Sequence, residues 1–191
     1  IIAVSKTFKI DKILPLIEYG HIDFGENKVQ EAVTKWTEIK NQNTNIKLHM
    51  IGKLQTNKVK EAVRLFDYIH SLDSLKLAKK IFNEQKKIKK NIKLFIQINI
   101  GNEVQKSGIL LEDLKDFYKI CKDDYQLDII GLMCIPPIDD NSEKYFEEMK
   151  KNSQKFLFSE LSMGMSSDYL LATKFNASFL RIGSKIFGKR I

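Results

Sequence analysis

The sequence is poor in cysteine, histidine and arginine, which excludes several kinds of site. Its 191 residues include two cysteines, Cys121 and Cys134, three histidines and three arginines. The cysteines show no metal-binding or redox spacing, and the histidines form no HExxH or other paired motif. We therefore expect no structural metal and no disulfide. Unpaired cysteines are typical of a reducing compartment, so we expect a cytoplasmic protein.

The sequence also lacks a long apolar run. No stretch approaches the roughly 20 apolar residues that span a bilayer, and no signal-peptide pattern is visible. We therefore expect no association with a membrane. Because the sequence starts at Ile1 rather than at methionine, we expect further residues to precede it.

Acidic residues are outnumbered by basic ones, but the excess consists almost entirely of lysine. The formal net charge is +8, with 32 lysines and arginines against 24 acidic residues. The lysines are spread over predicted helix faces, and no basic motif interleaved with aromatic residues accompanies them. We therefore expect no nucleic-acid binding. The alternative, an RNA-associated scaffold, predicts salt-sensitive RNA binding that does not depend on Lys6.

Short apolar runs alternate with longer amphipathic ones along the whole chain. The short runs predict strands near residues 1–6, 21–27, 46–52, 67–73, 92–100, 127–135, 158–166 and 178–188. The amphipathic runs predict helices near 9–20, 26–40, 54–66, 74–90, 110–123, 141–157 and 167–177. Strict alternation is typical of a parallel sheet, and eight units favour a closed barrel.

We therefore predict an α/β protein with a single TIM-type (β/α)8 barrel domain over residues 1–191. The alternative is a Rossmann-like open sheet, which is disfavoured because no GxGxxG motif follows the first predicted strand. The sequence shows no eighth helix after the last predicted strand, and we expect a preceding N-terminal helix to complete the wall of the barrel.

In a barrel of this kind function lies at the carboxyl ends of the strands. Lys6 ends the first predicted strand, directly after the apolar run IIAV and Ser5. An amine between apolar walls loses its proton more easily and becomes a better nucleophile toward carbonyl groups. The pattern therefore indicates a Schiff-base lysine. An ordinary edge lysine that extends to water would give the same pattern.

Arg181 interrupts the last predicted strand, FLRIG, in a chain that nearly avoids arginine. A buried arginine needs an acceptor or a carboxylate. The partner could be an acidic side chain such as Glu26 or Asp73, or a hydrogen-bond acceptor on a ligand.

Hydroxyl groups and glycine follow the seventh and eighth predicted strands. Ser162 and Ser166 belong to SMGMSS, and Gly183 and Ser184 belong to RIGS. Loops at these two positions of a barrel often bind phosphate through backbone N–H groups and hydroxyls. The sequence SSD before YLLATKF is also a simple helix cap, which is compatible with phosphate binding.

A lysine for an aldehyde, a phosphate site and a partner for a ring nitrogen together match pyridoxal 5′-phosphate (PLP). Seven motifs then occur in order: AVSKT, FGEN-x-VQEA, H-x-IG-x-LQ-x-NK, IQINI followed by KSGI, GLM-x-IP, S-x-GMS-x-D and RIG-x-x-IFG-x-R. In these motifs the sequence resembles the pyridoxal-phosphate homeostasis proteins, which are single-domain relatives of the alanine racemase N-terminal barrel. The resemblance spans essentially the whole chain.

The resemblance implies a role for several residues. Lys6 would carry PLP covalently as a Schiff base, and Arg181 would face the pyridine nitrogen, as the matching arginine of the racemase does. The groups that would hold the phosphate are Ser166, Gly183 and Ser184.

Three further side chains would line the same pocket: Asn27 would lie beside the cofactor, with His49 and Met133 nearby. The sequence departs from the family in two places. The family has about one helix ahead of AVSKT, so we expect missing residues there. It also has a longer connection where Leu157 and Phe158 stand here, so either a loop is missing at this point or this member of the family is trimmed.

The resemblance also implies a binding protein rather than an enzyme. An arginine beside the ring nitrogen keeps the ring a weak electron sink, and racemisation needs a second base that alanine racemase takes from a further domain. We therefore expect reversible PLP binding for buffering or delivery, with PLP-dependent apoenzymes as recipients and a monomeric state. The alternative is a low-activity PLP-dependent amino-acid racemase.

Overall fold

The protein is described by a computed structural model that covers residues 1–139 and 141–188. Its eight strands are all parallel and form a closed barrel in the order of the sequence. The strands are β1 (Ile2–Val4), β2 (Asp23–Glu26), β3 (Lys47–Met50), β4 (Tyr68–Leu72), β5 (Lys93–Ile98), β6 (Ile129–Cys134), β7 (Glu160–Met165) and β8 (Phe179–Ile182). The predicted TIM-type barrel is confirmed.

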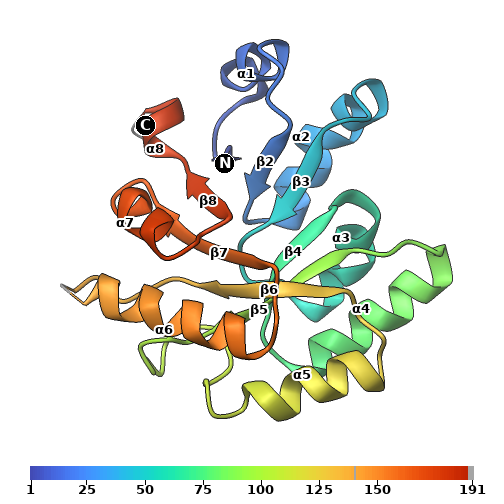
Figure 1. Cartoon of the computed structure of the whole chain (residues 1–191). Helices are drawn as coiled ribbons and strands as arrows, with labels where there is room; N and C mark the ends of the chain where they lie inside the picture. The colour runs from blue at the N-terminus through green and yellow to red at the C-terminus, as the bar shows by residue number, and fades with distance from the viewer. Residues whose placement is uncertain (140, 189–191) are drawn as a thin grey trace.

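Helices follow the strands and surround the barrel (Figure 1). They are α1 (Leu14–Glu18), α2 (Val29–Gln42), α3 (Val59–Leu65), α4 (Leu75–Ile88), α5 (Leu114–Asp123), α6 (Ser142–Lys155), α7 (Tyr169–Lys174) and α8 (Ser184–Phe187). Short 3-10 turns, η1 (Ile10–Lys12) and η2 (Thr56–Lys58), precede α1 and α3.

The strands are buried on both faces, which explains their near-continuous apolar sequences. Every residue of β5 after Lys93 is buried, and so is every residue of β3 after Lys47. One face of each strand packs against the helices and the other fills the barrel, as all-parallel sheets require. The polar side chains buried inside the barrel are therefore exceptions that need an explanation.

The end of the chain differs from the sequence-based expectation. The predicted last strand, 178–188, stops at Ile182, and the expected absence of an eighth helix is wrong. The carbonyl oxygen of Gly183 accepts hydrogen bonds from the N–H groups of Ile186 and Phe187, both at 2.9 Å. These bonds close a helical turn, so the chain passes directly from β8 into α8 (Figure 1).

A tight turn joins α6 to β7 over residues 156–159. Leu157 lies there in the left-handed region at φ 57° and is exposed. The N–H of Phe158 bonds to the carbonyl of Ser153, and the N–H of Leu157 bonds to that of Gln154. This is a Schellman-type helix end, and it connects the two elements directly.

The carboxyl end of β7 is shaped by Gly164, at φ 88°. A Cβ atom at this position would lie 2.6 Å from the Cβ of Ala172 on α7, so only glycine fits. The register between β7 and β8 shifts between Ser162 and Met165 at the same place. The irregularity places the residues that follow β7 beside the start of α8.

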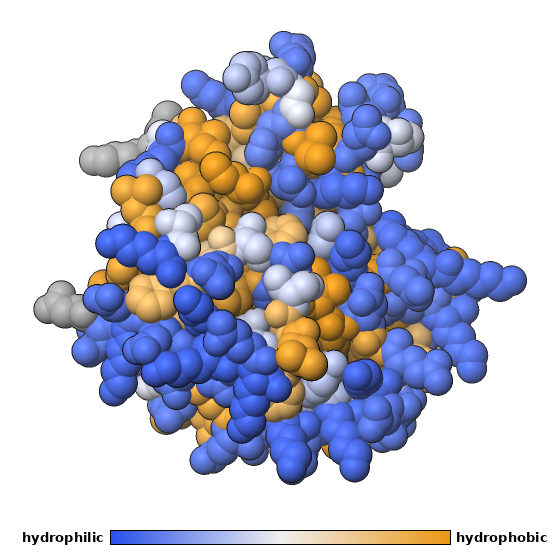
Figure 2. Space-filling view, in the orientation of Figure 1, coloured by the Kyte–Doolittle hydropathy of each residue, from blue (hydrophilic) through white to orange (hydrophobic). Residues whose placement is uncertain are grey.

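Hydrophilic side chains cover the outer helices, and apolar side chains are exposed in the upper centre of the face shown in Figure 2. Among the helices of residues 1–139 and 141–188, none has the length and apolar content that crossing a membrane requires.

Candidate functional site

A cavity of 610 Å³ lies at the carboxyl ends of the strands. This volume is typical of a site for a small molecule or cofactor. The lining residues come from the ends of β1, β2, β3, β6, β7 and β8, and they are Val4, Lys6, Phe8, Asn27, Ile51, Gly52, Ile135, Met165, Ser166, Ser167, Arg181, Gly183, Ser184, Lys185 and Gly188. Six of the eight predicted site residues are among them.

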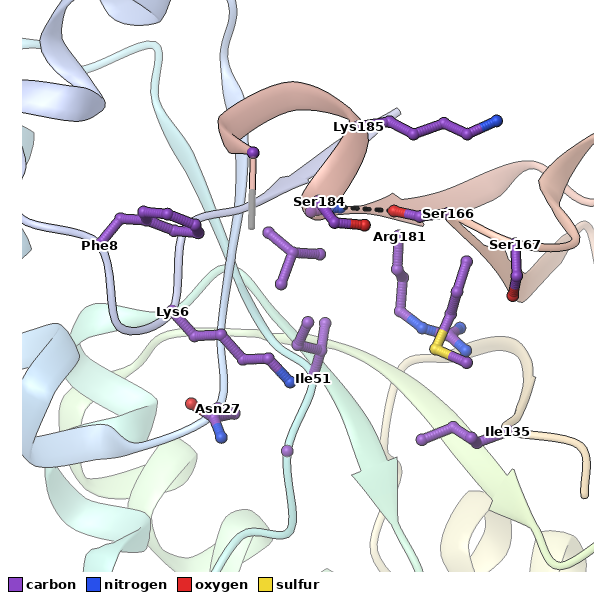
Figure 3. Close-up of a pocket in the computed structure, with 15 residues that line it drawn as sticks. Lys6, Phe8, Asn27, Ile51, Ile135, Ser166, Ser167, Arg181, Ser184 and Lys185 are labelled. Atoms are coloured by element: carbon purple, nitrogen blue, oxygen red, sulfur yellow. Dashed lines mark hydrogen bonds between the residues drawn. The ribbon is translucent and has the colours of Figure 1, made fainter. Parts of the chain in front are cut away.

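Lys6 enters the cavity from a rigid stretch of backbone. The N–H of Ser5 bonds to the carbonyl of Gly25 at 3.0 Å, and its hydroxyl donates to Glu26 Oε1 at 2.8 Å. The ammonium group of Lys35 bonds both the carbonyl oxygen of Ser5 and Glu26 Oε1, at 3.0 and 2.9 Å. With its neighbour fixed by these bonds, the Lys6 side chain extends into the cavity (Figure 3).

The amine of Lys6 lies near apolar side chains. Figure 3 shows its nitrogen directed toward Ile51, with Asn27 beside it and Arg181 across the cavity. Val4 and Ile135 add further apolar lining. The site therefore combines an amine with partly apolar walls.

Arg181 is buried at 4% exposure and is held by two neutral acceptors. Its Nη1 donates to Ser162 Oγ at 2.7 Å, and its Nη2 donates to the carbonyl oxygen of Cys134 at 2.8 Å. Of the acids that the sequence left open as partners, Glu26 accepts instead from Lys35 and from the Trp36 indole. Because two of its five donor hydrogens are used here, Arg181 retains donors for the cavity that it lines.

Asn27 contributes an acceptor that nothing in residues 1–139 and 141–188 satisfies. Its Oδ1 is buried and has no hydrogen-bond partner there. Gly52 packs directly on Asn27, since a Cβ at position 52 would lie 2.5 Å from the Asn27 carbonyl oxygen. A buried amide oxygen without a donor costs about 1–3 kcal/mol. Its place in the cavity lining therefore points to a donor on a ligand.

Ser166 and Gly183 meet at one side of the cavity. The N–H of Gly183 donates to Ser166 Oγ at 3.3 Å (Figure 3), and Ser184 lines the cavity next to them. Ser162, also a phosphate candidate in the sequence, faces the barrel interior instead. These hydroxyl and N–H groups form a polar edge suited to an anion such as phosphate.

His49 and Met133 are fully buried and are not brought into the cavity. Each lies one layer too deep in the barrel. Ile51 and Ile135 stand two residues further along the same chain segments, and these two line the cavity. Because side chains two apart in a strand point the same way, the pocket starts one layer above His49 and Met133.

Several residues that line the cavity were not predicted from the sequence. Ile51 and Ile135 could have been found by extending the strand alternation by two residues. Lys185 also lines the cavity and directly follows the predicted Ser184. Its ammonium group lies 4.6 Å from the centre of the Tyr169 ring. Phe8 has no signal in the sequence beyond its closeness to Lys6.

Residues 1–190 match the family model described as "Alanine racemase, N-terminal domain". The pyridoxal phosphate homeostasis protein of Haemophilus influenzae is 36% identical over 200 residues, covering 100% of this chain and 84% of that protein. The one of Escherichia coli K12 is 33% identical over 199 residues, covering 100% and 85%. The chain belongs to the pyridoxal phosphate homeostasis protein family. The family predicted from the seven motifs is confirmed.

Solved structures of this family share the fold. PipY of Synechococcus elongatus without PLP superposes with a TM-score of 0.92 at 34% identity, covering 98% of this chain and 91% of PipY. PipY with PLP bound gives 0.87 at 33% identity with the same coverage. Alanine racemase of Corynebacterium glutamicum, at 16% identity and a TM-score of 0.72, shares only the barrel fold, over 55% of its length.

Proposed function

We propose that this protein binds PLP reversibly through Lys6 and buffers or delivers it in the cytoplasm. One observation carries the proposal. Lys6, Arg181 and Asn27 line a single cavity of suitable size, and the buried Oδ1 of Asn27 has no hydrogen-bond partner among the described residues. The PipY relative, solved with PLP bound, supports the same cofactor.

The residues present fit the functional groups of PLP. Lys6 would hold the aldehyde group of PLP as a Schiff base, with loss of one water on binding and its return on release. Arg181 would donate to the pyridine nitrogen. Ser166, Ser184 and the N–H of Gly183 would hold the phosphate.

Two features favour binding over catalysis. Arg181 is a donor only, so a ring nitrogen facing it stays unprotonated and the ring stays a weak electron sink. Racemisation also needs a base on each face of the ligand. Of the described lining residues, only Lys6 and Lys185 have side chains that can serve as bases, and Lys185 is engaged over Tyr169.

A carrier of this kind must hand its cofactor on, so we propose PLP-dependent apoenzymes as recipients. Release would require only hydrolysis of the bond to Lys6. The monomeric state stays a prediction, and sedimentation equilibrium with and without PLP would test it.

The experiment is a PLP titration followed by visible absorption, on the unchanged protein and on Lys6→Ala and Lys185→Ala. We expect a Schiff-base band in the unchanged protein and in Lys185→Ala, its loss in Lys6→Ala, and trapping of the bond by borohydride. Identical spectra for all three proteins would refute the proposal. Amino-acid-dependent exchange of the α-proton into deuterated water would instead support the racemase alternative.

A further inference from the structure

A chain of hydrogen bonds crosses the barrel interior from Arg181 to Asp23. Arg181 Nη1 lies 2.7 Å from Ser162 Oγ, which lies 2.8 Å from His70 Nδ1. His70 Nε2 lies 3.0 Å from His49 Nδ1, and His49 Nε2 lies 3.0 Å from Asp23 Oδ1. The five residues come from five different strands, β8, β7, β4, β3 and β2.

Aromatic rings hold the two imidazoles of this chain in place. The His49 ring stacks on Tyr68 with centroids 4.3 Å apart, and the His70 ring stacks on Phe95 at the same distance. Phe179 packs edge-on against His70 at 5.9 Å. Both histidines are fully buried, so their rings have no room to rotate away from their partners.

The chemistry of the two ends gives the chain one direction. Arginine can only donate, so Ser162 Oγ accepts from Arg181 and its own proton goes to His70 Nδ1. His70 then carries its proton on Nε2 and donates to His49 Nδ1. His49 in turn carries its proton on Nε2 and donates to the carboxylate of Asp23.

The titration behaviour of the groups agrees with this direction. Burial lowers the pKa of His70 well below its usual value, with further lowering by His49 and Arg181. Burial also lowers the pKa of His49, although Asp23 opposes the effect. Burial alone would raise the pKa of Asp23, but the hydrogen bond from His49 contributes to a net lowering. These shifts favour two neutral histidines and one carboxylate, which is the charge state that the hydrogen-bond chain requires.

We propose that Asp23, His49, His70 and Ser162 are positioning residues that fix the Arg181 guanidinium from below the cavity. With its proton directed at His70, the Ser162 hydroxyl presents its lone pairs to Arg181. With Nη2 held by the Cys134 carbonyl, the remaining donors of Arg181 serve the cavity. The geometry of the chain is independent of any ligand, while its role in holding PLP rests on the function proposed above.

The first test uses the protein without added ligand. Long-range ¹H–¹⁵N NMR of the imidazole rings at pH 7 distinguishes the two neutral tautomers and the charged form. We expect His49 and His70 to be neutral and protonated on Nε2, with the half-buried His21 as an internal reference. Protonation of either ring on Nδ1, or on both nitrogens, would overturn the proposed direction of the chain.

The second test measures the dissociation constant for PLP. We expect Ser162→Ala to weaken binding about tenfold, the effect of losing one hydrogen bond to a charged group, and Ser162→Thr to restore it by returning the hydroxyl. The matched control is Ser71→Ala on β4, a buried serine whose hydroxyl has no partner among the described residues. It should change binding by about twofold or less.

A third variant provides the test if Ser162→Ala does not fold. If circular dichroism shows that Ser162→Ala is unfolded, Asp23→Asn tests the chain from its far end, away from the cavity. We expect it to weaken PLP binding severalfold and to move the His70 nitrogen resonances, which a purely local structural role would not do. Unchanged PLP binding in the folded variants would overturn the positioning role. Absence of PLP binding by the unchanged protein would refute the proposed function. The NMR result would still test the direction of the hydrogen-bond chain.

Discussion

The mouth of the barrel and its interior handle buried polar groups in opposite ways. In the interior, His49 and His70 are fully buried, and each ring nitrogen has a partner within 3.0 Å. At the mouth, Asn27 Oδ1 is equally buried and has no partner in the described part of the chain. The hydrogen-bond chain between the two histidines and their neighbours is complete by itself, whereas Asn27 at the mouth lacks a donor.

This difference separates two roles that look alike in a list of buried polar residues. A satisfied network stabilises the fold and fixes the side chains at its ends. An open acceptor reduces stability until a ligand supplies the missing hydrogen bond. Arg181 belongs to both regions, since it bonds to Ser162 of the interior hydrogen-bond chain and also lines the cavity. Substitutions on the two sides should therefore change different quantities.

The largest effect is expected from His70→Ala. The substitution leaves Ser162 and His49 without their central partner and opens a cavity in the core. We expect the free energy of unfolding of the PLP-free protein to fall by about 3 kcal/mol. Urea denaturation followed by circular dichroism measures it. A fall of less than about 1 kcal/mol would show that the interior network does not stabilise the barrel.

The next effect is a dependence of stability on pH. Both histidines have a pKa below the usual value in the folded protein because of burial, with Asp23 and Arg181 as the charged groups at the two ends of their chain. The unfolded chain therefore binds more protons below about pH 6.5. Stability is fully present above that pH and falls as the pH decreases.

The slope approaches about 1.4 kcal/mol per pH unit for each histidine that stays neutral, so the expected loss between pH 7 and pH 5.5 is roughly 1–3 kcal/mol, with His70 as the main contributor because its pKa is lowered further. Urea denaturation at a series of pH values gives the slope. His70→Ala should reduce that slope by at least half, and Asn27→Ala should leave it unchanged. A flat profile over this range would contradict the neutral state of the buried rings.

The smallest effect on folding is expected from Asn27→Ala. Its side-chain oxygen has no partner to lose, and removing this open acceptor should offset the packing that is lost with the amide. The free energy of unfolding without PLP should therefore not fall by more than about 0.5 kcal/mol. Its PLP affinity should fall about tenfold. Denaturation and PLP titration of the same preparation give both numbers. A large loss of stability without PLP would place Asn27 with the interior network and not with the site.

The fold and six of the residues that line the candidate cavity could be predicted from the sequence. Eight apolar runs separated by amphipathic ones correspond to the eight observed strands, because a buried parallel sheet leaves that pattern. Lys6 and Arg181 were recognisable because each is a charge in an apolar run. Periodicity gives the direction of a side chain but not its depth in the barrel. His49 and Met133 were therefore expected one layer too high.

The interior chain could not have been predicted. Asp23 and Ser162 are 139 positions apart in the sequence, and only the closure of the barrel brings them into one network with the two histidines. The short helix α8 was missed for a local reason. Its sequence, SKIF, continues an apolar strand pattern, and the hydrogen bonds to the Gly183 carbonyl that form the turn are not visible in composition.

The proposed function requires that Lys6, and no other lysine, holds the cofactor. Lys185 provides the sharpest comparison because it lines the same cavity but lies over the Tyr169 ring. The protein would be incubated with PLP, reduced with borohydride, digested and mapped by tandem mass spectrometry. We expect the reduced PLP adduct on Lys6, at close to one per chain. An adduct mainly on Lys185, or spread over the surface lysines, would contradict this expectation.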